Sequence, residues 1–354
     1  MGNDQAGVSD KKAREMAERG RRSKWWRRLG SMKSGFWYQD AGGNRIDDEE
    51  GLERIKRLVI PPAWKYVRIS PSKSGRLQAV GIDTTGRIQY LYHPAFVRSQ
   101  ERKKFAKIED FGRHLPKLRA KTNEDMALEG FPREKVMAIM MRLINSLYFR
   151  VGTEKSVEKH KTYGITTFHN KHLTIGEKGE LTFEFVGKSH IKHRKILVDE
   201  ELAELMKDLK KLGKVGKLFH YIGDNGKPKA VTPADLNRYI KEAIDADFTA
   251  KDFRTWGGTL LAATELAEIG CTDIEKEIQT NIVAAVKRVA EQLGNTPAVC
   301  RASYIHPLVI ESYCKGTSIA EFQPRRSRRI TRIEHDFEPE ERALLKLLEN
   351  GTGK

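Results

Sequence analysis

The chain has 354 residues, enough for two or three domains, and 39% of them are hydrophobic, so a substantial core is possible. Charged residues make up 32% and the formal net charge is +17, which predicts a polyanionic partner: nucleic acid first, an anionic membrane surface second. No apolar run approaches the roughly 20 residues that span a bilayer, and the N-terminus lacks an apolar signal core, so we expect neither a membrane-spanning nor a secreted protein.

The cysteines and histidines give no sign of a metal site or a disulfide framework. Cys271, Cys300 and Cys314 are odd in number and lack CxxC spacing, which favours a reducing compartment and a cytoplasmic protein. His190 and His193 share a basic run in which solvated or phosphate-facing roles are favoured over metal ligation. We therefore expect no metal ion and no other cofactor.

Residues 1–30 are strongly basic, with nine Lys or Arg against four Asp or Glu. This balance predicts a mobile basic arm. Trp25 and Trp26 lie inside it, and we expect them to pack on the fold because an exposed pair of tryptophans is costly in water.

Residues 31–105 have the pattern of a small, mostly antiparallel sheet domain. A helix over Glu49–Leu58 is ended by prolines at 61 and 62, and an aromatic run at 36–38 precedes a glycine-rich turn. Short runs of β-formers, separated by Ser, Gly and Asp clusters, predict strands at Tyr66–Ile69, Leu77–Ile82 and Arg87–Tyr92.

Residues 106–320 are predicted to form a larger, mainly helical domain. A charged helix over Arg98–Lys121 leads into it, and the clearest helix, Arg133–Phe149, has apolar residues at i, i+3 and i+4. Two alternating runs, Leu173–Ile175 and Leu181–Val186, predict a β-hairpin.

Capping residues mark the later helices of this domain. Thr232 and Thr249 each precede a helix, and Gly294 ends a long amphipathic helix over Asp273–Leu293. A Thr-Pro pair at 296–297 restarts a helix at once, and we expect that helix to carry Tyr304.

Residues 321–354 are predicted to form a basic tail with one short helix over Pro339–Leu348. Five arginines lie within Arg325–Arg332. With the sheet domain in front and the mainly helical domain behind it, the fold class is α+β.

Four separated residues have the chemistry needed to attack a phosphodiester without a metal: Arg150, Lys188, Arg254 and Tyr304. Arginine stays protonated and its planar fork matches two phosphate oxygens, while lysine can donate a proton to a leaving oxygen. A tyrosine nucleophile gives a phenolate that is a good leaving group when the bond must be reversed.

Each of these residues also has an ordinary structural explanation. Arg150 could stabilise its helix by interacting with the negative C-terminal end of the helix dipole, and Lys188 could be a solvated turn residue. Arg254 is electrostatically misplaced near a helix N-terminus, which favours an anionic partner unless Asp252 pairs with it. Tyr304 could be a core residue, so only the joint pattern carries the functional interpretation.

Together with their neighbours, these residues resemble the small type IB DNA topoisomerases of bacteria and poxviruses over about residues 58–316. Seven segments carry the resemblance in the order of that family: IPPAW at Ile60–Trp64, GRIQYLYHP at Gly86–Pro94, FRVG at Phe149–Gly152, TYGITTFHNKH at Thr162–His172, FVGK at Phe185–Lys188, KDFRTWGG at Lys251–Gly258 and GNTPAVCRASYIHP at Gly294–Pro307.

The resemblance implies a catalytic role for five residues. Tyr304 would be the nucleophile that forms a 3′-phosphotyrosyl link, and Arg150 and Arg254 would hold the scissile phosphate. Lys188 would protonate the leaving 5′-oxygen, and Asn295, where poxvirus members have histidine, would donate a hydrogen bond to a phosphate oxygen. One nicked strand could then rotate and be religated, relaxing supercoils without ATP or a metal.

The resemblance also implies contacts with double-stranded DNA. Gln89, Tyr90 and Tyr92 of the sheet domain and Lys251 of the helical domain would touch it. Ser156 stands where the poxvirus members have a tyrosine that helps to read the cleavage site, so their strict pentameric preference is not carried over. We expect a monomer that acts as a clamp on the DNA of the nucleoid.

Two other interpretations remain at this point. A tyrosine recombinase uses the same chemistry, but such enzymes usually have histidine three residues before the second arginine, where this chain has Lys251. A non-enzymatic chromatin protein would explain the net charge equally well, but it leaves the spaced Arg150, Lys188, Arg254 and Tyr304 without a role.

Overall fold

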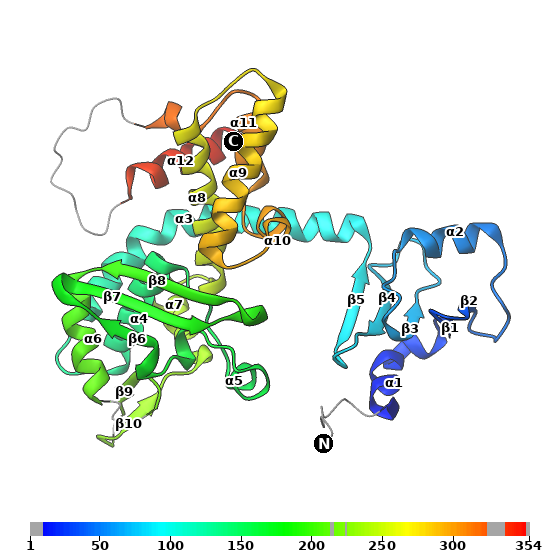
Figure 1. Ribbon diagram of the computed structural model, residues 1–354, viewed down its shortest axis with the longest axis horizontal. Coiled ribbons are helices and arrows are strands. Elements are labelled where there is room, and N and C mark those ends of the chain that lie inside the picture. Colours follow the sequence, from blue (N-terminus) through cyan, green and yellow to red (C-terminus); the bar gives the residue numbers. More distant parts are fainter. Residues whose placement is uncertain (1–9, 213–215, 224, 324–336, 352–354) are drawn as a thin grey trace. The chain divides into compact units, whose positions relative to one another are not determined.

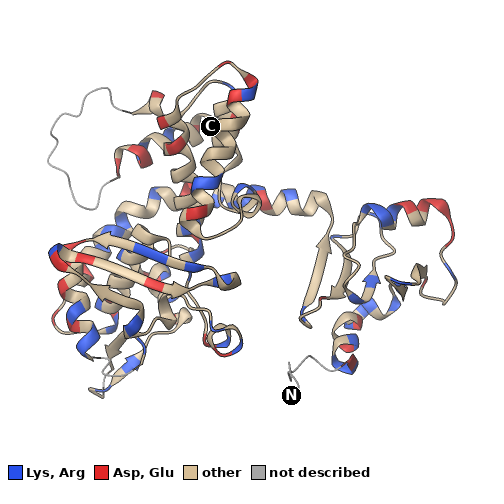
Figure 2. Cartoon of the chain, viewed as in Figure 1, with Lys and Arg blue, Asp and Glu red and all other residues tan. Residues whose placement is uncertain are grey.

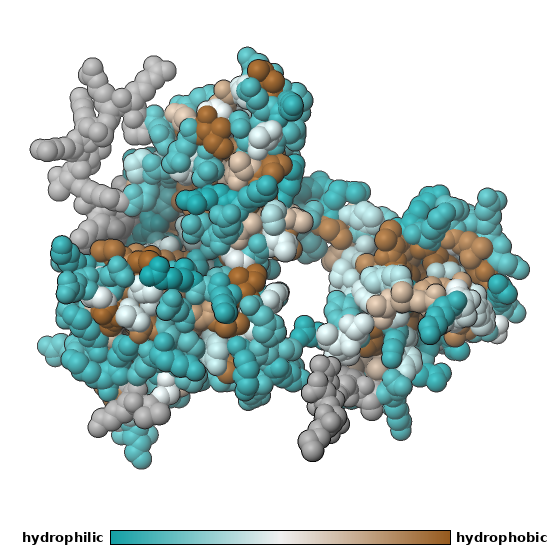
Figure 3. All heavy atoms as spheres, in the orientation of Figure 1, coloured by the Kyte–Doolittle hydropathy of each residue, from teal (hydrophilic) through white to brown (hydrophobic). Residues whose placement is uncertain are grey.

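The computed structural model describes residues 10–212, 216–223, 225–323 and 337–351 (Figure 1). The chain divides into two compact units, residues 1–104 and 105–354. Hydrophilic residues cover most of the visible surface of each unit (Figure 3). In the part of the chain so described, no helix combines the length and the apolar character needed to cross a membrane.

The first unit is built on a five-stranded antiparallel sheet in the order β2-β1-β3-β4-β5. Its strands are β1 (Trp26–Ser31), β2 (Gly35–Gln39), β3 (Lys65–Ile69), β4 (Leu77–Ile82) and β5 (Ile88–Tyr92). Helix α2 (Glu49–Arg57) begins at Asp48, whose carboxylate accepts a hydrogen bond from the Gly51 amide. Ile55 of α2 is buried with Val67 and Ile69 of β3 in a small core.

The mobile arm expected over residues 1–30 is replaced by ordered elements from Asp10 onward. Helix α1 (Asp10–Glu18) buries Ala13 and Ala17 against the sheet, and a 3-10 turn, η1 (Gly20–Lys24), leads into β1. Trp26 starts β1 and packs against the small core, as its cost in water suggested. These elements are hard to predict from the sequence because most of their residues are charged or polar. Only two alanines of α1 are fully buried, so α1 has almost no apolar pattern. Residues 1–9 lie outside the described residues.

The second unit is mainly helical, as predicted, and helix α3 leads into it from the first. Its helices are α3 (Pro94–Met126), α4 (Arg133–Leu147), α5 (Glu154–His160), α6 (Glu200–Leu212), α7 (Pro233–Ile244), α8 (Ala250–Ile269), α9 (Glu275–Leu293), α10 (Pro297–Ser303), α11 (Pro307–Cys314) and α12 (Pro339–Gly351). Most residues of α4 are buried, so this helix runs through the hydrophobic core of the unit.

A three-stranded antiparallel sheet in the order β6-β7-β8 lies against these helices. It contains the predicted hairpin, β6 (Leu173–Ile175) and β7 (Glu180–Val186), and a third strand that the sequence analysis missed, β8 (Lys192–Val198). Figure 2 shows basic residues along β8 and acidic residues along β7. The many polar residues of β8 obscure the alternation of buried and exposed positions along the strand. Its composition is therefore typical of a loop. A smaller pair, β9 (His220–Ile222) and β10 (Pro228–Ala230), completes the strands.

The predicted capping residues begin and end the helices around which the site is built. Thr232 and Thr249 form capping boxes at the starts of α7 and α8, and Thr296 caps α10 with Pro297 in its first turn. Gly294 ends α9 in the left-handed conformation, with φ of 59°.

The helix predicted in the basic tail is α12, and it belongs to the core of the second unit. Its apolar face is buried at Leu344, Leu345 and Leu348, among others, and it packs against α8 and α11. The arginine-rich segment at 325–332 lies outside the described residues. Helix α12 is therefore a structural part of the second unit.

Candidate active site

Arg150 reaches the site because the chain turns sharply at the end of α4. Tyr148 ends that helix in the left-handed conformation, with φ of 54°, and the next residue, Phe149, is buried. The Arg150 Nη2 donates to the Gly294 carbonyl at 2.7 Å and to the Asn295 Oδ1 at 2.6 Å. Arg150 thus binds the C-terminal end of α9, not that of its own helix.

Arg254 is the fifth residue of α8 and is only 4% exposed. Its guanidinium donates to the carbonyl groups of Tyr148 and Leu293, the latter at 2.8 Å. Asp252, the possible ion-pair partner, instead caps α8 and pairs with Lys107 at 3.2 Å. The explanation of Arg254 as half of a salt bridge with Asp252 is therefore wrong, and its charge is available for an anion.

Tyr304 directly follows α10 and lies beneath the guanidinium of Arg254. The Arg254 Cζ is 5.2 Å from the centroid of the tyrosine ring. A Cβ on Gly258 would lie 2.7 Å from the Tyr304 carbonyl oxygen, so only glycine lets α8 approach this closely. The Thr259 hydroxyl donates to the same oxygen at 3.2 Å. The backbone of the tyrosine is thus docked on the helix that carries Arg254.

Two buried N–H groups at this point have no hydrogen-bond partner among the described residues. They are the Nδ2 of Asn295, whose Oδ1 is already held by Arg150, and the Nε of Arg254. Buried donors are nearly always satisfied in folded proteins, by protein groups, by water or by a bound ligand. An oxyanion beside the Tyr304 ring would accept from donors of this kind.

The cluster is positively charged, and no carboxylate of the described residues pairs with its arginines. Burial, with help from Arg254, lowers the pKa of Arg150 to about 10. Burial also lowers the pKa of Arg254, an effect that the neighbouring Tyr304 partly offsets. Within the described residues, neither arginine forms an ion pair with Asp or Glu; they donate to three carbonyl groups and to the Asn295 side chain, and Arg254 also interacts with the Tyr304 side chain. Both arginines remain cationic at neutral pH and favour a bound anion.

Lys188 lies in the turn between β7 and β8, where Ser189 and His190 both have left-handed φ values. Its side chain is exposed and, within the described ranges, makes no hydrogen bond or ion pair. The structure therefore brings Arg150, Arg254 and Tyr304 together with Asn295 but leaves the Lys188 ammonium free at the tip of a hairpin.

The four residues predicted to touch DNA lie in two places. Tyr90 and Tyr92 are both 42% exposed on β5, an edge strand, with ring centroids 6.2 Å apart. Gln89 precedes the two tyrosines on the same strand, and its side-chain amide donates to the Asp83 carboxylate at 2.7 Å. Lys251 is an exposed residue in the first turn of α8 in the second unit. Paired exposed tyrosines on a sheet edge suit contact with sugar, phosphate or bases.

Two residues of β8 also lie at the site: Lys195, which was not predicted from the sequence, and His193, which was considered there only as part of a basic run. The Lys195 Nζ donates to the Gln292 carbonyl at 2.7 Å, and burial together with Arg254 and Arg150 lowers the pKa of Lys195 to about 8. Two residues earlier, His193 shares this face of the strand. Their period-two spacing in KHRKILV was the available signal, but the basic composition concealed it.

His193 packs directly on the glycine that ends α9. It stacks on Phe185 with centroids 4.9 Å apart, and a Cβ on Gly294 would clash with its Cε1. Gly294 is therefore required both for its left-handed φ and for this close approach. Burial first, then Lys195 and the arginines, lowers the pKa of His193 to about 4, so its ring is neutral at pH 7.

Because protonation of His193 is disfavoured in the folded state, folding stability should fall in acid. The pKa of about 4 lies below the ordinary 6.5, so the unfolded chain binds the proton first as the pH drops from about 6.5 to 4. The midpoint of urea unfolding should decrease over this window, and His193→Phe should flatten the decrease. An unchanged pH dependence in the variant would contradict the assignment.

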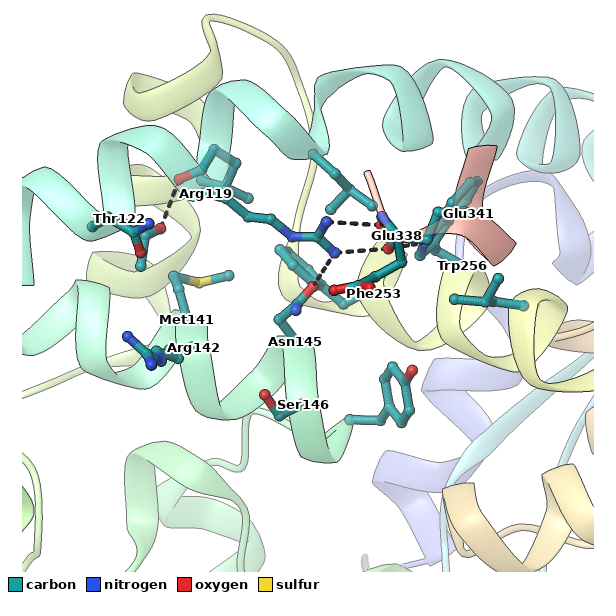
Figure 4. Close-up of a pocket in the computed structure, with 15 residues that line it drawn as sticks. Arg119, Thr122, Met141, Arg142, Asn145, Ser146, Phe253, Trp256, Glu338 and Glu341 are labelled. Atoms are coloured by element: carbon teal, nitrogen blue, oxygen red, sulfur yellow. Dashed lines mark hydrogen bonds and ion pairs between the residues drawn. The ribbon is translucent and has the colours of Figure 1, made fainter. Parts of the chain in front are cut away.

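One cavity borders this cluster and a second lies among the helices of the same unit. One, of about 640 Å³, lies between β8 and the end of α9 and is lined by His193, Lys195 and Asn295, among others. The other, of about 670 Å³, is lined by α3, α4, α8 and α12 (Figure 4). Tyr148 lines both cavities, and its backbone carbonyl accepts a hydrogen bond from Arg254.

Comparison with known proteins gives the family of the chain. Residues 94–329 match the catalytic core of eukaryotic DNA topoisomerase I, and residues 35–83 match the N-terminal domain of bacterial DNA topoisomerase IB. The chain is 33% identical to DNA topoisomerase 1B of Acanthamoeba polyphaga mimivirus over 79% of this chain and 86% of the relative.

More distant relatives have the same description. Identity to DNA topoisomerase 1B of Vaccinia virus (strain Copenhagen) is 24%, over 75% of this chain and 82% of the viral one. Identity to DNA topoisomerase 1 of Candidozyma auris is 27%, over 70% of this chain but only 29% of that longer protein. The chain belongs to the type IB DNA topoisomerases, in the small form typical of bacteria and poxviruses, and its activity is that family's relaxation of DNA.

Proposed function

We propose that Tyr304 is the nucleophile and that Arg150, Arg254 and Asn295 hold the scissile phosphate of double-stranded DNA. The observation that carries this assignment is the position of the Arg254 guanidinium over the Tyr304 ring, beside buried N–H donors that lack a partner. An oxyanion bound to these donors would lie next to the phenol. Charge that develops on the phosphate would then meet fixed cations and dipoles.

In each step, one bond to phosphorus forms while another bond to phosphorus breaks. The Tyr304 oxygen loses its proton and forms a bond to phosphorus, while the bond from phosphorus to the 5′-oxygen breaks and that oxygen takes up a proton. The 3′-end is held as a phosphotyrosine, the freed strand rotates, and the 5′-hydroxyl attacks phosphorus to reverse the reaction. Because a phosphodiester is present before and after the reaction, the reaction does not need ATP.

In this proposal Lys188 provides the proton for the leaving 5′-oxygen. Its exposed ammonium at the tip of the β7–β8 hairpin is free to approach a bound DNA strand, and no carboxylate pairs with it in the described residues. Tyr90, Tyr92, Gln89 and Lys251 would contact the duplex outside the reacting phosphate. A single chain supplies all of these groups, which is consistent with a monomer acting on the nucleoid.

Replacing Lys188 with Ala should slow strand cleavage by about 10²–10⁴-fold, the usual contribution of a general acid. A DNA substrate with a 5′-bridging sulfur should restore most of the rate, because a thiolate leaves without being protonated. The measurement is single-turnover cleavage on matched oxygen and sulfur substrates. Equal slowing on both substrates would mean that Lys188 is not the acid.

The proposed function as a whole is tested by relaxation of a supercoiled plasmid in EDTA without ATP. We expect full relaxation and, after quenching with detergent, a DNA strand covalently bound to the protein through its 3′-end. A plasmid without special sites also separates relaxation from site-specific recombination. A 5′-linked strand or no covalent complex would contradict the proposal.

A further inference from the structure

Three cations bind the last carbonyl groups of α9. The final carbonyls of a helix lack partners within the helix and carry the negative end of its dipole. Here three successive ones each accept a side-chain hydrogen bond from a different element: Gln292 from Lys195 at 2.7 Å, Leu293 from Arg254 at 2.8 Å and Gly294 from Arg150 at 2.7 Å. Lys195 is thus bound in the same way as the two arginines.

Lys195 differs from the arginines in the element that carries it. It comes from β8, the strand that follows the turn containing Lys188. Exposure alternates along β8, and His193, Lys195 and Leu197 form its half-buried face. His193 packs on Gly294 while Lys195 binds Gln292, so this face of the strand lies on the end of α9.

At the tip of the hairpin, the end of β7 is held from outside by the Tyr163 amide, which donates to the Val186 carbonyl at 2.8 Å. The Gly187 amide donates to the Ile191 carbonyl at 2.8 Å, which closes the turn on itself, and Lys188 has no partner in the described part of the chain. The position of Lys188 is therefore determined by the two strands, and β8 is the outer strand of its sheet. Whatever holds β8 to α9 also sets the distance from Lys188 to the arginines.

We propose that Lys195 is a positioning residue, whose hydrogen bond to the Gln292 carbonyl holds the β7–β8 hairpin on the end of α9 and so places Lys188 beside the phosphate bound by Arg150 and Arg254. This inference rests on the proposed function, in which Lys188 acts at that phosphate. A side chain that only filled space would not need to be a cation, and this one retains its ammonium next to two arginines despite its burial.

The first experiment compares Lys195→Met with Lys192→Met in single-turnover cleavage at saturating DNA. Methionine keeps the unbranched stem and loses the ammonium. Lys192 lies on the exposed face of the same strand and loses the same charge, so it controls for weakened attraction to DNA. We expect Lys195→Met to reduce the cleavage rate by about 100-fold, the loss that a misplacement of a catalytic group by about 1 Å can cause. We expect little change for the control. Lys195→Arg should recover most of the rate, and equal losses in both methionine variants would overturn the proposal.

The second experiment places Lys195→Met in the Lys188→Ala background. If Lys195 acts through Lys188, the double variant should cleave no more slowly than Lys188→Ala alone. The sulfur-bridged substrate should also restore Lys195→Met to the extent that it restores Lys188→Ala. Losses that multiply in the double variant would overturn the proposal, because they would mean that Lys195 acts independently of the hairpin tip.

Amide hydrogen exchange makes the test independent of catalysis. In free protein, Lys195→Met should speed exchange at residues 186–192 and leave α7 and α12 unchanged. Unchanged exchange in the hairpin would overturn the inference, and so would general acceleration, which indicates global destabilisation. A wild-type chain that forms no covalent complex would instead refute the proposed function, so the two failures are distinguishable.

Discussion

Tyr304→Phe should abolish plasmid relaxation and covalent capture while leaving DNA affinity nearly unchanged. The substitution removes one oxygen from a ring that lies beneath Arg254 and is packed on α8 through its backbone. The loss should be on the order of 10⁶-fold, as expected when an enzyme loses its nucleophile. The measurements are relaxation, detergent-trapped adduct and binding of a nicked duplex.

Tyr313→Phe provides a matched control from the same part of the molecule. Tyr313 is on α11, is 1% exposed, donates to the Gly270 carbonyl at 2.6 Å and accepts from Asn281 at 2.8 Å. Its loss leaves buried groups unsatisfied and should reduce the free energy of unfolding by about 1–3 kcal/mol without changing the chemistry. Substantial relaxation by Tyr304→Phe, or its loss in Tyr313→Phe, would contradict the assignment of the nucleophile.

Glu341→Ala should reduce the free energy of unfolding by about 3 kcal/mol or more, because it removes the carboxylate that pairs with a largely buried arginine. Glu341 on α12 is 3% exposed and accepts two hydrogen bonds from Arg119 on α3, at 2.7 and 2.8 Å (Figure 4). Its carboxylate also accepts from the indole of Trp256 on α8 at 3.4 Å. Because α8 carries Arg254, cleavage should also slow. Thermal unfolding and single-turnover cleavage measure the two effects.

The paired replacement Arg119→Met with Glu341→Leu separates charge from packing. An apolar pair of similar size leaves no buried charge behind, and such exchanges are often neutral or stabilising. The double variant should therefore unfold near the wild-type temperature, although Glu341→Ala alone does not. If both variants lose the same stability, the contribution of Glu341 comes from its shape and not from its charge pair.

Local signals in the sequence are strongest where a backbone group needs a particular residue. Leu77–Ile82 has the predicted bounds, and the helices that begin after Thr232, Thr249 and Thr296 do so because a side-chain oxygen and a favourable first turn act within a few residues. Gly294 likewise ends α9 where the sequence predicts. Signals of this kind survive in a single sequence, because they do not depend on the rest of the fold.

Elements stabilised by distant partners were not predictable in this way. Helix α1 is held by the burial of Ala13 and Ala17 against a sheet formed much later in the chain, and β8 is a strand because it pairs with β7. The candidate site shows the same contrast between local signals and contacts with distant residues. The residue types at Arg150, Arg254 and Tyr304 could be read from their motifs, but no local pattern indicates that Arg150 binds carbonyl and amide oxygens 144 and 145 residues away.

The absence of a carboxylate around Arg150, Arg254 and Lys195, within the part of the chain described, couples the folding of this protein to its substrate. Gathering three cations costs free energy that the unfolded chain, with each charge separately hydrated, does not incur. On the proposed function, a phosphate bound by Arg150 and Arg254 would remove that cost only in the folded state, so DNA would act as a stabilising ligand by mass action. The protein is therefore expected to be most resistant to unfolding when it is bound to DNA, and inorganic phosphate would reproduce part of that protection.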